Sequence, residues 1–233
     1  MPKKDWVIKQ ATITNLCDDS YQVSVLFEYK DIAVQSKDIT TDTTIGLDYK
    51  SNGLYVDSNN HRPDTNKYYH QSQDKLAKRQ RKLKHKQVGS NNYYKQQKKI
   101  AKIHRKISNQ RKDFLQKEST SITKKYACIV VEDLDMKSMS NKDFGNGKAT
   151  LDNGYGMFLR MLDYKTKREG GTLIRVDKWY ASSQICHCCG QVHKEMKELF
   201  RRKLVCNCGY QEDRDYNSAK NIKREGLRML GIS

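Results

Sequence analysis

The N-terminal segment of the chain alternates apolar and polar residues. Two runs, WVIKQATITN at residues 6–15 and YQVSVLFEYK at residues 21–30, are separated by the turn-forming residues CDDS. Successive side chains of a β-strand point to opposite faces, so this alternation predicts two strands that pair and bury one face. We therefore expect residues 6–29 to form a half-buried β-hairpin, which is a fragment of a sheet and not a domain.

Three further apolar runs predict strands. The run TTIGLDYKSNGLYVDSNN at residues 43–60 has two short apolar stretches around a Ser-Asn-Gly turn, which would begin a second sheet. The run YACIVVE at residues 126–132 is apolar without alternation, as is typical of a strand in a sheet covered on both faces. Residues 172–180, TLIRVDKWY, predict another strand, in which we expect Trp179 to be packed rather than stacked on a base.

Apolar residues recur at helical intervals elsewhere. Between residues 75 and 112 they predict two helices interrupted near residues 88–91, and the pattern is carried by Leu76, Leu83, Ile100, Ile103 and Ile107. Residues 157–168 predict a helix ended by two glycines, and a last helix is expected from about residue 215 to residue 229. The glycine-rich stretch 141–156 predicts a mobile loop.

The charge of the chain is strongly positive and unevenly placed. Its formal net charge is +18 at pH 7, and a polyanionic partner, nucleic acid first among the candidates, relieves self-repulsion of this size. Residues 75–112 hold fifteen Lys or Arg residues and no Asp or Glu, so no carboxylate one helical turn away can neutralise them. An ordinary solvated helical face is the alternative. We predict instead that phosphates neutralise the segment, through Lys98, Lys99, Lys102, Arg105 and Lys106.

No segment is expected to cross a membrane. No apolar run reaches the roughly 18 residues that span a bilayer, and the N-terminal residues MPKKDWVIKQ have no apolar stretch of the signal-peptide kind.

Five of the seven cysteines fall within residues 186–208, and such clustering is typical of metal binding rather than of a disulfide framework. We expect a cytoplasmic protein with a small core, because only 36% of its residues are hydrophobic.

The cysteine cluster has the spacing of a zinc ribbon. Cys186 and Cys189 form C-x-x-C followed by a glycine, while Cys206 and Cys208 form C-x-C followed by a glycine. Two such pairs predict a tetrahedral four-cysteine site for a structural Zn²⁺. The second pair departs by one residue from the common spacing, so Cys208 is the ligand that spacing supports least. The histidine and the cysteine inside the first pair are spare donors, which we expect not to bind metal.

Three acidic residues stand where strands end or a helix begins. Asp48 ends one predicted strand, Glu132 ends another, and Asp215 begins the last helix. Side chains at strand ends converge beside a sheet, and carboxylates grouped there repel one another unless a cation is bound. Mg²⁺ or Mn²⁺ suits such a set, and two ions about 3.5–4 Å apart would support phosphodiester cleavage. Taken singly, such acids are more often turn formers or helix caps.

Four segments carry the motifs of a known family. TTIGLDYKSNGLYVDSN, IVVEDLDMKSM and the terminal DRDYNSAKNI resemble, in order, the three RuvC motifs of the TnpB (OrfB) proteins of insertion sequences, and SSQICHCCG with CNCG resembles their inserted zinc ribbon. That family is similar to the type V CRISPR effectors. The resemblance covers nearly all of the chain from about residue 42. It implies an RNase H-like α/β fold and RNA-guided DNA cleavage, with Asp48, Glu132 and Asp215 as ligands of Mg²⁺ or Mn²⁺. Asp213 competes for the third position, and we prefer Asp215.

The resemblance also divides the chain into parts. Residues 41–180 and 210–233 would form a RuvC-like nuclease domain, a mixed sheet with flanking helices and a basic helical insertion at about 75–118. Residues 181–209 would form the zinc ribbon. Residues 1–40 would be a β-hairpin remnant of an N-terminal barrel domain.

These features predict a transposon-associated, metal-dependent RNA-guided DNA endonuclease, with DNA and a guide RNA as partners. The family's members usually carry a larger N-terminal half, so we expect a truncated or split form whose guided cutting needs a protein partner supplying that half, or a second copy. The alternative is a nuclease-inactive DNA- or RNA-binding regulator, or a transposition accessory protein, on the same scaffold. The presence of all three acids at the motif positions favours catalysis.

Overall fold

The computed structural model describes residues 6–29, 34–64, 67–135, 152, 154–198 and 200–232. Most of the glycine-rich stretch 141–156, where the sequence predicts a mobile loop, lies outside these residues. The chain divides into two compact units, of which the first comprises residues 1–33 and 67–112 and the second residues 34–66 and 113–233.

The first unit contains the predicted N-terminal hairpin. Strands β1 (Val7–Asn15) and β2 (Tyr21–Glu28) pair antiparallel, as the alternation indicates. The expected burial of one face is wrong: every residue of β1 is exposed, and apolar side chains such as Ile13 (69%) and Val23 (59%) face solvent. Alternation determines which side chains share a face, but burial also needs a second layer, and no described residue covers β1.

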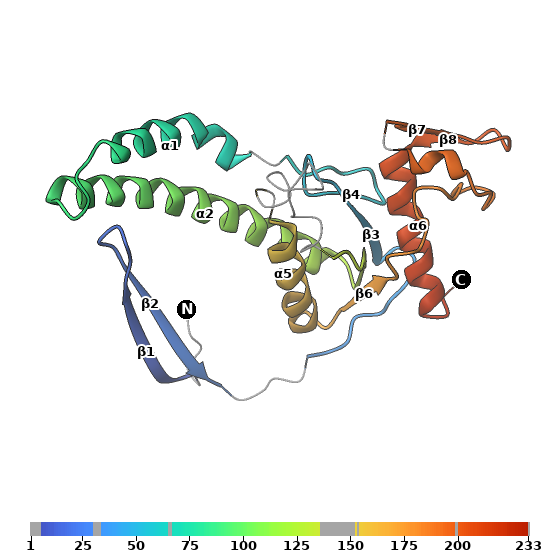
Figure 1. The fold of residues 1–233 in the computed structure, drawn as a ribbon. Helices are drawn as coiled ribbons and strands as arrows, with labels where there is room; N and C mark the ends of the chain where they lie inside the picture. The colour runs from blue at the N-terminus through green and yellow to red at the C-terminus, as the bar shows by residue number, and fades with distance from the viewer. Residues whose placement is uncertain are drawn as a thin grey trace. The chain divides into compact units, whose positions relative to one another are not determined.

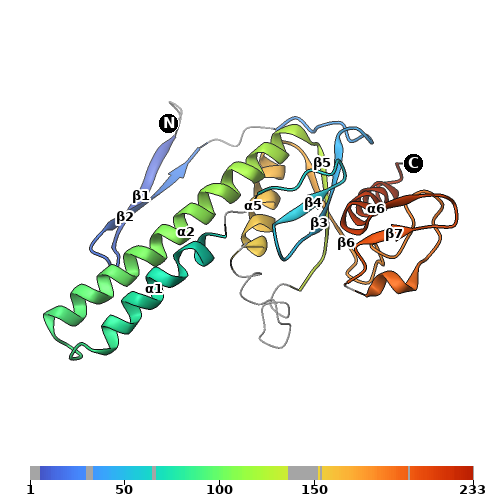
Figure 2. The same cartoon turned by 90° about the horizontal axis from the view of Figure 1, so that it is seen from above.

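The basic segment forms a helical hairpin. Helix α1 (Tyr68–Lys84) and helix α2 (Asn91–Lys125) are separated at residues 85–90, close to the predicted break. Figure 1 and Figure 2 both show the first part of α2 running beside α1. Between the helices, Gln96 is buried and its Nε2 donates to the carbonyl oxygen of Arg79 at 2.9 Å, which fastens one helix to the other.

A four-stranded mixed sheet forms the centre of the second unit. Its strand order is β4 (Tyr55–Asp57), β3 (Thr44–Tyr49), β5 (Cys128–Glu132) and β6 (Thr172–Val176). β4 pairs antiparallel with β3, whereas β3 with β5 and β5 with β6 pair parallel. The strand predicted at residues 172–180 ends at Val176, because Asp177 accepts a hydrogen bond from the backbone N–H of Trp179 at 2.7 Å and closes a turn.

Helices cover both faces of this sheet, which explains why β5 is apolar at successive positions. The covering helices are α2, α5 (Tyr155–Arg168) and α6 (Arg214–Met229). Ile129 and Val131 of β5 pack in a cluster with residues of α2 and α5. Cys128 and Val130 point to the other face and pack with Ile222 of α6. Figure 2 shows the strands between α5 and α6. The prediction of a strand covered on both faces is confirmed.

Two glycines let α6 lie close against the sheet. A Cβ atom on Gly46 of β3 would come within 2.3 Å of the carbonyl oxygen of Ala219, and one on Gly226 would come within 2.4 Å of a valine side chain on β5. A larger residue at either place would therefore push α6 away from the sheet. The close approach brings Ser218 of α6 within hydrogen-bond distance of Asp48 on β3.

The cysteine-rich segment forms a small ribbon between β6 and α6. It contains the 3₁₀ helix η2 (Lys194–Lys197) and an antiparallel pair, β7 (Lys203–Val205) and β8 (Gln211–Asp213). Its core consists of Cys186, Met196, Leu204 and Cys206. The expected α/β class is confirmed: a mixed sheet with flanking helices, an N-terminal hairpin and a four-cysteine ribbon.

None of the helices in the described ranges is long and apolar enough to cross a membrane.

Candidate metal sites and nucleic-acid-binding surface

The four cysteines singled out by their spacing converge in the ribbon. The sulfur atoms of Cys186, Cys189, Cys206 and Cys208 all lie within 4.8 Å of one another. Cys186 and Cys208 are separated by 3.7 Å, and Cys189 and Cys206 by 3.5 Å. Four thiolates bound tetrahedrally at a Zn–S distance of about 2.3 Å lie about 3.8 Å apart, so this set fits Zn²⁺. Cys208 belongs to the cluster despite its shorter spacing.

A glycine closes each cysteine turn. Gly190, with φ of +78°, donates its backbone N–H to the carbonyl oxygen of Cys186 at 2.9 Å, and Gly209, with φ of +87°, donates to Cys206 at 3.0 Å. Glycine adopts positive φ without steric cost, which explains its place after each pair. The spare donor His187 is engaged elsewhere, since its Nδ1 lies 3.1 Å from Oδ1 of an asparagine on α6.

The three carboxylates singled out by sequence come from neighbouring elements. Asp48 lies near the end of β3, Glu132 ends the adjacent parallel strand β5, and Asp215 lies in the first turn of α6. Burial raises the pKa of Asp48 well above its ordinary value, and the charges of Glu132 and Asp215 raise it further. Burial also raises the pKa of Glu132. The fold thus brings the three acids close enough for their charges to repel.

These carboxylates are more widely spaced than the sulfurs. Within the described ranges, the four cysteines are the only group of three or more His, Cys, Asp or Glu side chains whose ligand atoms are close enough to share one metal ion. Oxygen ligands of Mg²⁺ do not all have to come from protein, because this ion commonly keeps several waters and takes one or two carboxylates directly. A wider set of acids therefore still fits a hard cation that is partly hydrated.

Two serines that the sequence analysis did not single out link Asp48 to Glu132. Ser218 Oγ lies 3.0 Å from Asp48 Oδ1, and Ser182 Oγ lies 2.6 Å from Glu132 Oε1. The two hydroxyl oxygens are 2.8 Å apart. Ser218 donates to the Asp48 carboxylate, and this hydrogen bond partly opposes the rise in its pKa. Ser182 donates to the Glu132 carboxylate, so the two adjoining hydroxyl groups connect the two acids.

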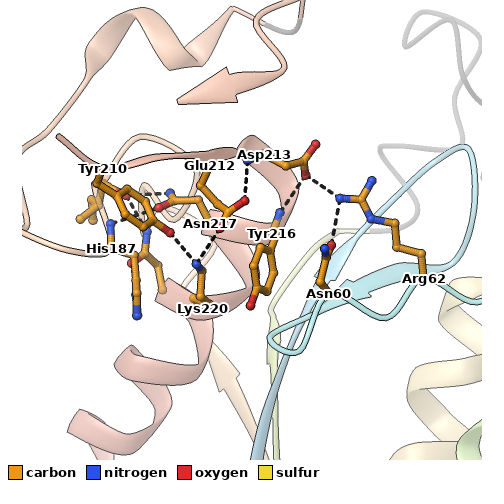
Figure 3. Close-up of polar contacts among 11 residues, drawn as sticks. Asn60, Arg62, His187, Tyr210, Glu212, Asp213, Tyr216, Asn217 and Lys220 are labelled. Carbon is orange, nitrogen blue, oxygen red and sulfur yellow. Dashed lines mark hydrogen bonds and ion pairs between the residues drawn. The ribbon is translucent and has the colours of Figure 1, made fainter. Parts of the chain in front are cut away.

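The two candidates for the third acid have different surroundings. Asp213 is the N-cap of α6: its Oδ1 accepts a hydrogen bond from a backbone N–H of the first turn at 3.1 Å and one from Arg62 at 2.9 Å (Figure 3). Asp215 is paired with Lys50, whose Nζ lies 3.0 Å from Oδ2, and its side chain is 17% exposed against 37% for Asp213. The charge of Asp215 also contributes to the raised pKa of Asp48.

Two of the five basic residues chosen as phosphate ligands already have acidic partners. Lys98 Nζ lies 2.6 Å from Asp19 Oδ2, and Arg105 Nη2 lies 2.8 Å from Asp18 Oδ2, both in the turn of the N-terminal hairpin. The premise that the basic segment meets no carboxylate is therefore wrong for Lys98 and Arg105, because the counter-charges come from a distant part of the sequence. A cation that is already paired gains less from a phosphate.

A cavity of about 460 Å³ lies between α1 and α2, and its lining is basic. It is lined by Arg79, Lys82, His85, Lys86, Asn92, Lys95, Gln96 and Lys99. None of the five Lys and Arg side chains forms an ion pair with a described acidic residue. Uncompensated positive charges around one groove are suited to phosphates. Of the five residues chosen from the sequence, Lys99 lines this groove.

The fold is that of the Cas12f type. One solved structure, the "Cryo-EM structure of the Cas12f1-sgRNA-target DNA complex", superposes with a TM-score of 0.58 at 19% identity, over 87% of this chain and 42% of the other. Another, the "Cryo-EM structure of CRISPR-Cas12f Ternary Complex", gives a TM-score of 0.54 at 18% identity, over 88% and 42%. Identities this low establish the similarity of the fold alone.

Sequence comparison then identifies the family. The OrfB/IS605 family model, described as "Probable transposase", matches residues 24–143, which is half of the chain, and the model "Cas12f1-like, TNB domain" matches residues 155–222. The chain belongs to this OrfB/IS605, or TnpB, family.

Two curated relatives have similar sequences. The "Putative RNA-guided DNA endonuclease" of Streptomyces pristinaespiralis is 34% identical over 190 residues, which are 80% of this chain and 46% of that protein. The "Putative RNA-guided DNA endonuclease InsQ" of Escherichia coli (strain K12) is 32% identical over 239 residues, which are 96% of this chain and 58% of that protein. The chain thus spans about half the length of these relatives.

Proposed function

We propose that this chain carries the nuclease centre of a TnpB-type, RNA-guided DNA endonuclease, with Asp48, Glu132 and Asp215 as its catalytic residues. The observation that carries the proposal is the grouping of these carboxylates at one edge of the sheet, where burial and mutual repulsion raise the pKa of Asp48. Like charges beside a buried acid destabilise it, whereas a divalent cation is stabilised by all of them. The names of the two relatives support the same activity.

The three acids would hold Mg²⁺ or Mn²⁺ through their carboxylate oxygens. When bound, such ions supply an activated water and neutralise the charge that develops on the scissile phosphate. The chain's own residues orient the ligands: Ser218 holds Asp48, and Lys50 holds Asp215. A bound cation would offset the burial and the repulsion that raise the pKa of Asp48, because it competes with protons for the same carboxylate.

The ribbon is proposed to bind one structural Zn²⁺ through its four cysteines. The support is the spacing of the sulfurs, which matches tetrahedral thiolate ligation. Four protein ligands leave no open position for a substrate, so the role is to hold the ribbon together rather than to catalyse.

DNA and a guide RNA are the proposed partners. The groove between α1 and α2 is the proposed contact for phosphates, and it retains Lys99 from the set chosen by sequence. Lys102 and Lys106, which are exposed on α2, remain candidates, while the paired Lys98 and Arg105 are weaker ones. A nucleic acid in this groove would neutralise charges for which the described part of the chain offers no acidic partner.

The test is cleavage of target DNA by the protein purified with its co-expressed RNA, in Mg²⁺ and in chelator. Asp48→Ala, Glu132→Ala and Asp215→Ala should each lower cleavage at least about a hundredfold, because each ligand is needed to hold the metal. Nucleic-acid binding should survive all three changes. Wild-type protein that binds normally but never cleaves in Mg²⁺ or Mn²⁺ would instead identify a nuclease-inactive regulator.

Asp213→Ala is the matched control, because it removes a carboxylate two residues away from Asp215. It should keep cleavage and lose about 1 kcal/mol of stability through the missing helix cap. An inactive Asp213→Ala protein beside an active Asp215→Ala protein would reverse the assignment of the third acid.

A further inference from the structure

Trp179 is the most exposed large apolar side chain in the described ranges, at 81%. The sequence predicts a packed residue within a continuing strand, and this expectation is wrong because β6 ends at Val176. Burying an indole removes about 150–250 Å² from water, so an exposed one forgoes much of the stabilisation that its size offers. A tryptophan kept in solvent at a fixed place offers an open aromatic face to a partner outside the chain.

The turn that carries Trp179 is held firmly. Asp177 Oδ1 accepts a hydrogen bond from the backbone N–H of Trp179 at 2.7 Å, and the carbonyl oxygen of Asp177 accepts one from Tyr180 at 2.9 Å. Tyr180 is partly buried against the apolar cluster beneath the sheet. One aromatic residue of the turn thus packs inward while its neighbour stays in solvent, so the exposure is not that of a loose segment.

The same turn borders the proposed catalytic acids. Val176 pairs with Glu132 in the parallel register of β5 and β6, and Ser182 donates to the Glu132 carboxylate at 2.6 Å. Trp179 lies midway in sequence between these two residues. A cation accompanies the ring, because Lys178 Nζ lies 5.2 Å from the indole centroid.

We propose that Trp179 is a stacking platform for an unpaired base of the nucleic-acid strand that passes the acid site. An indole face stacks on any base, and Lys178 offers a charge to the neighbouring phosphate. Trp179 is then a positioning residue, which holds the strand and takes no part in the chemistry. The link to cleavage rests on the proposed function, whereas the stacking itself does not.

Fluorescence can report this contact directly, because the chain has only two tryptophans, Trp6 and Trp179. In a Trp6→Phe protein all tryptophan emission comes from Trp179. Titration with short oligo(dT) or oligo(U) in buffer without Mg²⁺ or Mn²⁺, where no metal-dependent cleavage occurs and the proposed zinc stays bound, should quench this emission in a saturable way. The DNA and RNA arms show which strand the platform prefers, and oligonucleotides lacking bases should quench far less, since they offer no ring to stack.

The affinity changes test whether the ring contributes to binding. Trp179→Ala should weaken binding of the single strand about tenfold, and Trp179→Phe should restore most of the loss because an aromatic face remains. Phe200→Ala is the matched control: Phe200 is 76% exposed, and the Arg201 guanidinium lies 5.7 Å from its ring, but it belongs to the ribbon. Its loss should leave the affinity unchanged.

Unquenched Trp179 emission at saturating oligonucleotide, or a Trp179→Ala protein with wild-type affinity and a wild-type circular dichroism spectrum, would overturn the proposal. Saturable quenching in a protein that never cleaves DNA would leave the platform standing and refute the nuclease assignment. Quenching that persists in Asp48→Ala would show that the platform works without an intact acid cluster.

Discussion

At the scale of single residues, the Asp48 carboxyl group is placed where its charge is costly. Its pKa in the folded protein lies well above the ordinary value of 3.8, first because of burial and then because of Glu132 and Asp215. The folded state therefore holds this proton at pH values where the unfolded chain has released it. Stability from this group is present below about pH 4 and falls as pH rises through the folded pKa.

Asp48→Asn should therefore stabilise the metal-free protein at neutral pH. The amide oxygen still accepts the hydrogen bond from Ser218, and the amide carries no charge to be repelled by Glu132. We expect the melting temperature in buffer without Mg²⁺ or Mn²⁺ to rise, by about 2–4 °C for each kcal/mol gained, and its decline with pH to flatten. Excess Mg²⁺ should reverse the order, because only the wild-type set binds the ion tightly. Thermal melts at several pH values, with and without Mg²⁺ and with the proposed zinc left in place, measure both effects.

Asp213→Asn is the control for this comparison. Asn caps a helix about as well as Asp, and Asp213 is partly exposed and paired with Arg62 outside the cluster. Its replacement should leave the melting temperature in buffer without Mg²⁺ or Mn²⁺ within a degree or so of the wild type. A melting temperature that falls in Asp48→Asn would mean that the carboxylate is not repelled in the folded protein.

At the scale of elements, the basic helices divide into a paired side and an unpaired groove. Part of α2 faces the turn of the N-terminal hairpin, where Asp18 and Asp19 neutralise Arg105 and Lys98. The groove between α1 and α2 has no such partner among the described acids. Counting charges along the sequence treats both sides alike, because a helix period shows which residues share a face and not what lies opposite that face.

A groove variant, Lys82→Gln with Lys95→Gln and Lys99→Gln, should bind nucleic acid more weakly and with a flatter salt dependence. Each lost phosphate contact lowers the slope of log affinity against log salt by roughly one unit. The control is Lys98→Gln with Lys102→Gln and Lys106→Gln, which removes the same charge from α2 outside the groove. Affinity measured over a range of salt concentrations should change clearly less in the control.

Equal slopes in the two variants would show that net charge, and not the groove, sets the affinity. A larger loss of affinity in the control variant would mean that the residues chosen from sequence alone form the binding surface. Both variants keep α-helical side chains of similar length at exposed or partly exposed positions, so a loss of fold is not the expected cause of either result.

The elements themselves could largely be predicted from sequence, because each depends on local patterns. The alternation at residues 6–29 predicts the hairpin, and the run of apolar residues at β5 predicts a strand covered on both faces. The predictions of burial were wrong, because both β1 and Trp179 are exposed. Burial depends on which other element covers a face, and a single sequence carries little information on that.

At the scale of the whole second unit, α6 links the ribbon to the acid cluster. Asn217 and Asn221, both fully buried on α6, donate to the carbonyl oxygen of Ile185 at 2.8 Å and 2.6 Å. Asn221 also donates to the carbonyl oxygen of Ser182 at 2.8 Å, and the Ser182 hydroxyl holds Glu132. The segment that enters the ribbon is therefore the same segment that positions Glu132, one of the proposed catalytic carboxylates.

This linkage explains which parts of the site the sequence could show. The cysteine pairs and the acids have local signals, namely spacing, flanking glycines and positions at element ends. The contact between Ser182 and Ser218 joins residues 36 positions apart and depends on Gly46 letting α6 approach the sheet. Such a contact forms only when the elements have packed, so no local sequence pattern predicts it.

Removal of the proposed zinc should disturb the acid cluster, because the ribbon is linked to it through α6 and Ser182. The ribbon has a small apolar core of four residues, so metal binding supplies much of the ribbon's folding free energy. We expect about one Zn²⁺ per chain by elemental analysis, and chelation should raise amide hydrogen exchange first across residues 181–212. Cleavage should then fall although the acids are untouched, because the chain around Ser182 no longer holds Glu132 in place.

Two neighbouring cysteines allow a matched test of the zinc effect, in which the Cys189→Ala variant loses a ligand and the Cys188→Ala variant is the control. Cys189→Ala removes a ligand and should lose the metal, the protection of residues 181–212 and most of the cleavage. Cys188→Ala removes the exposed neighbouring thiol, which is not part of the four-sulfur group, and should keep all three. Rapid exchange in the ribbon without any loss of cleavage would contradict the linkage, since Ser182 would then position Glu132 without the ribbon. Zinc lost equally from both variants would instead make Cys188 a ligand, and the four-cysteine assignment would be wrong.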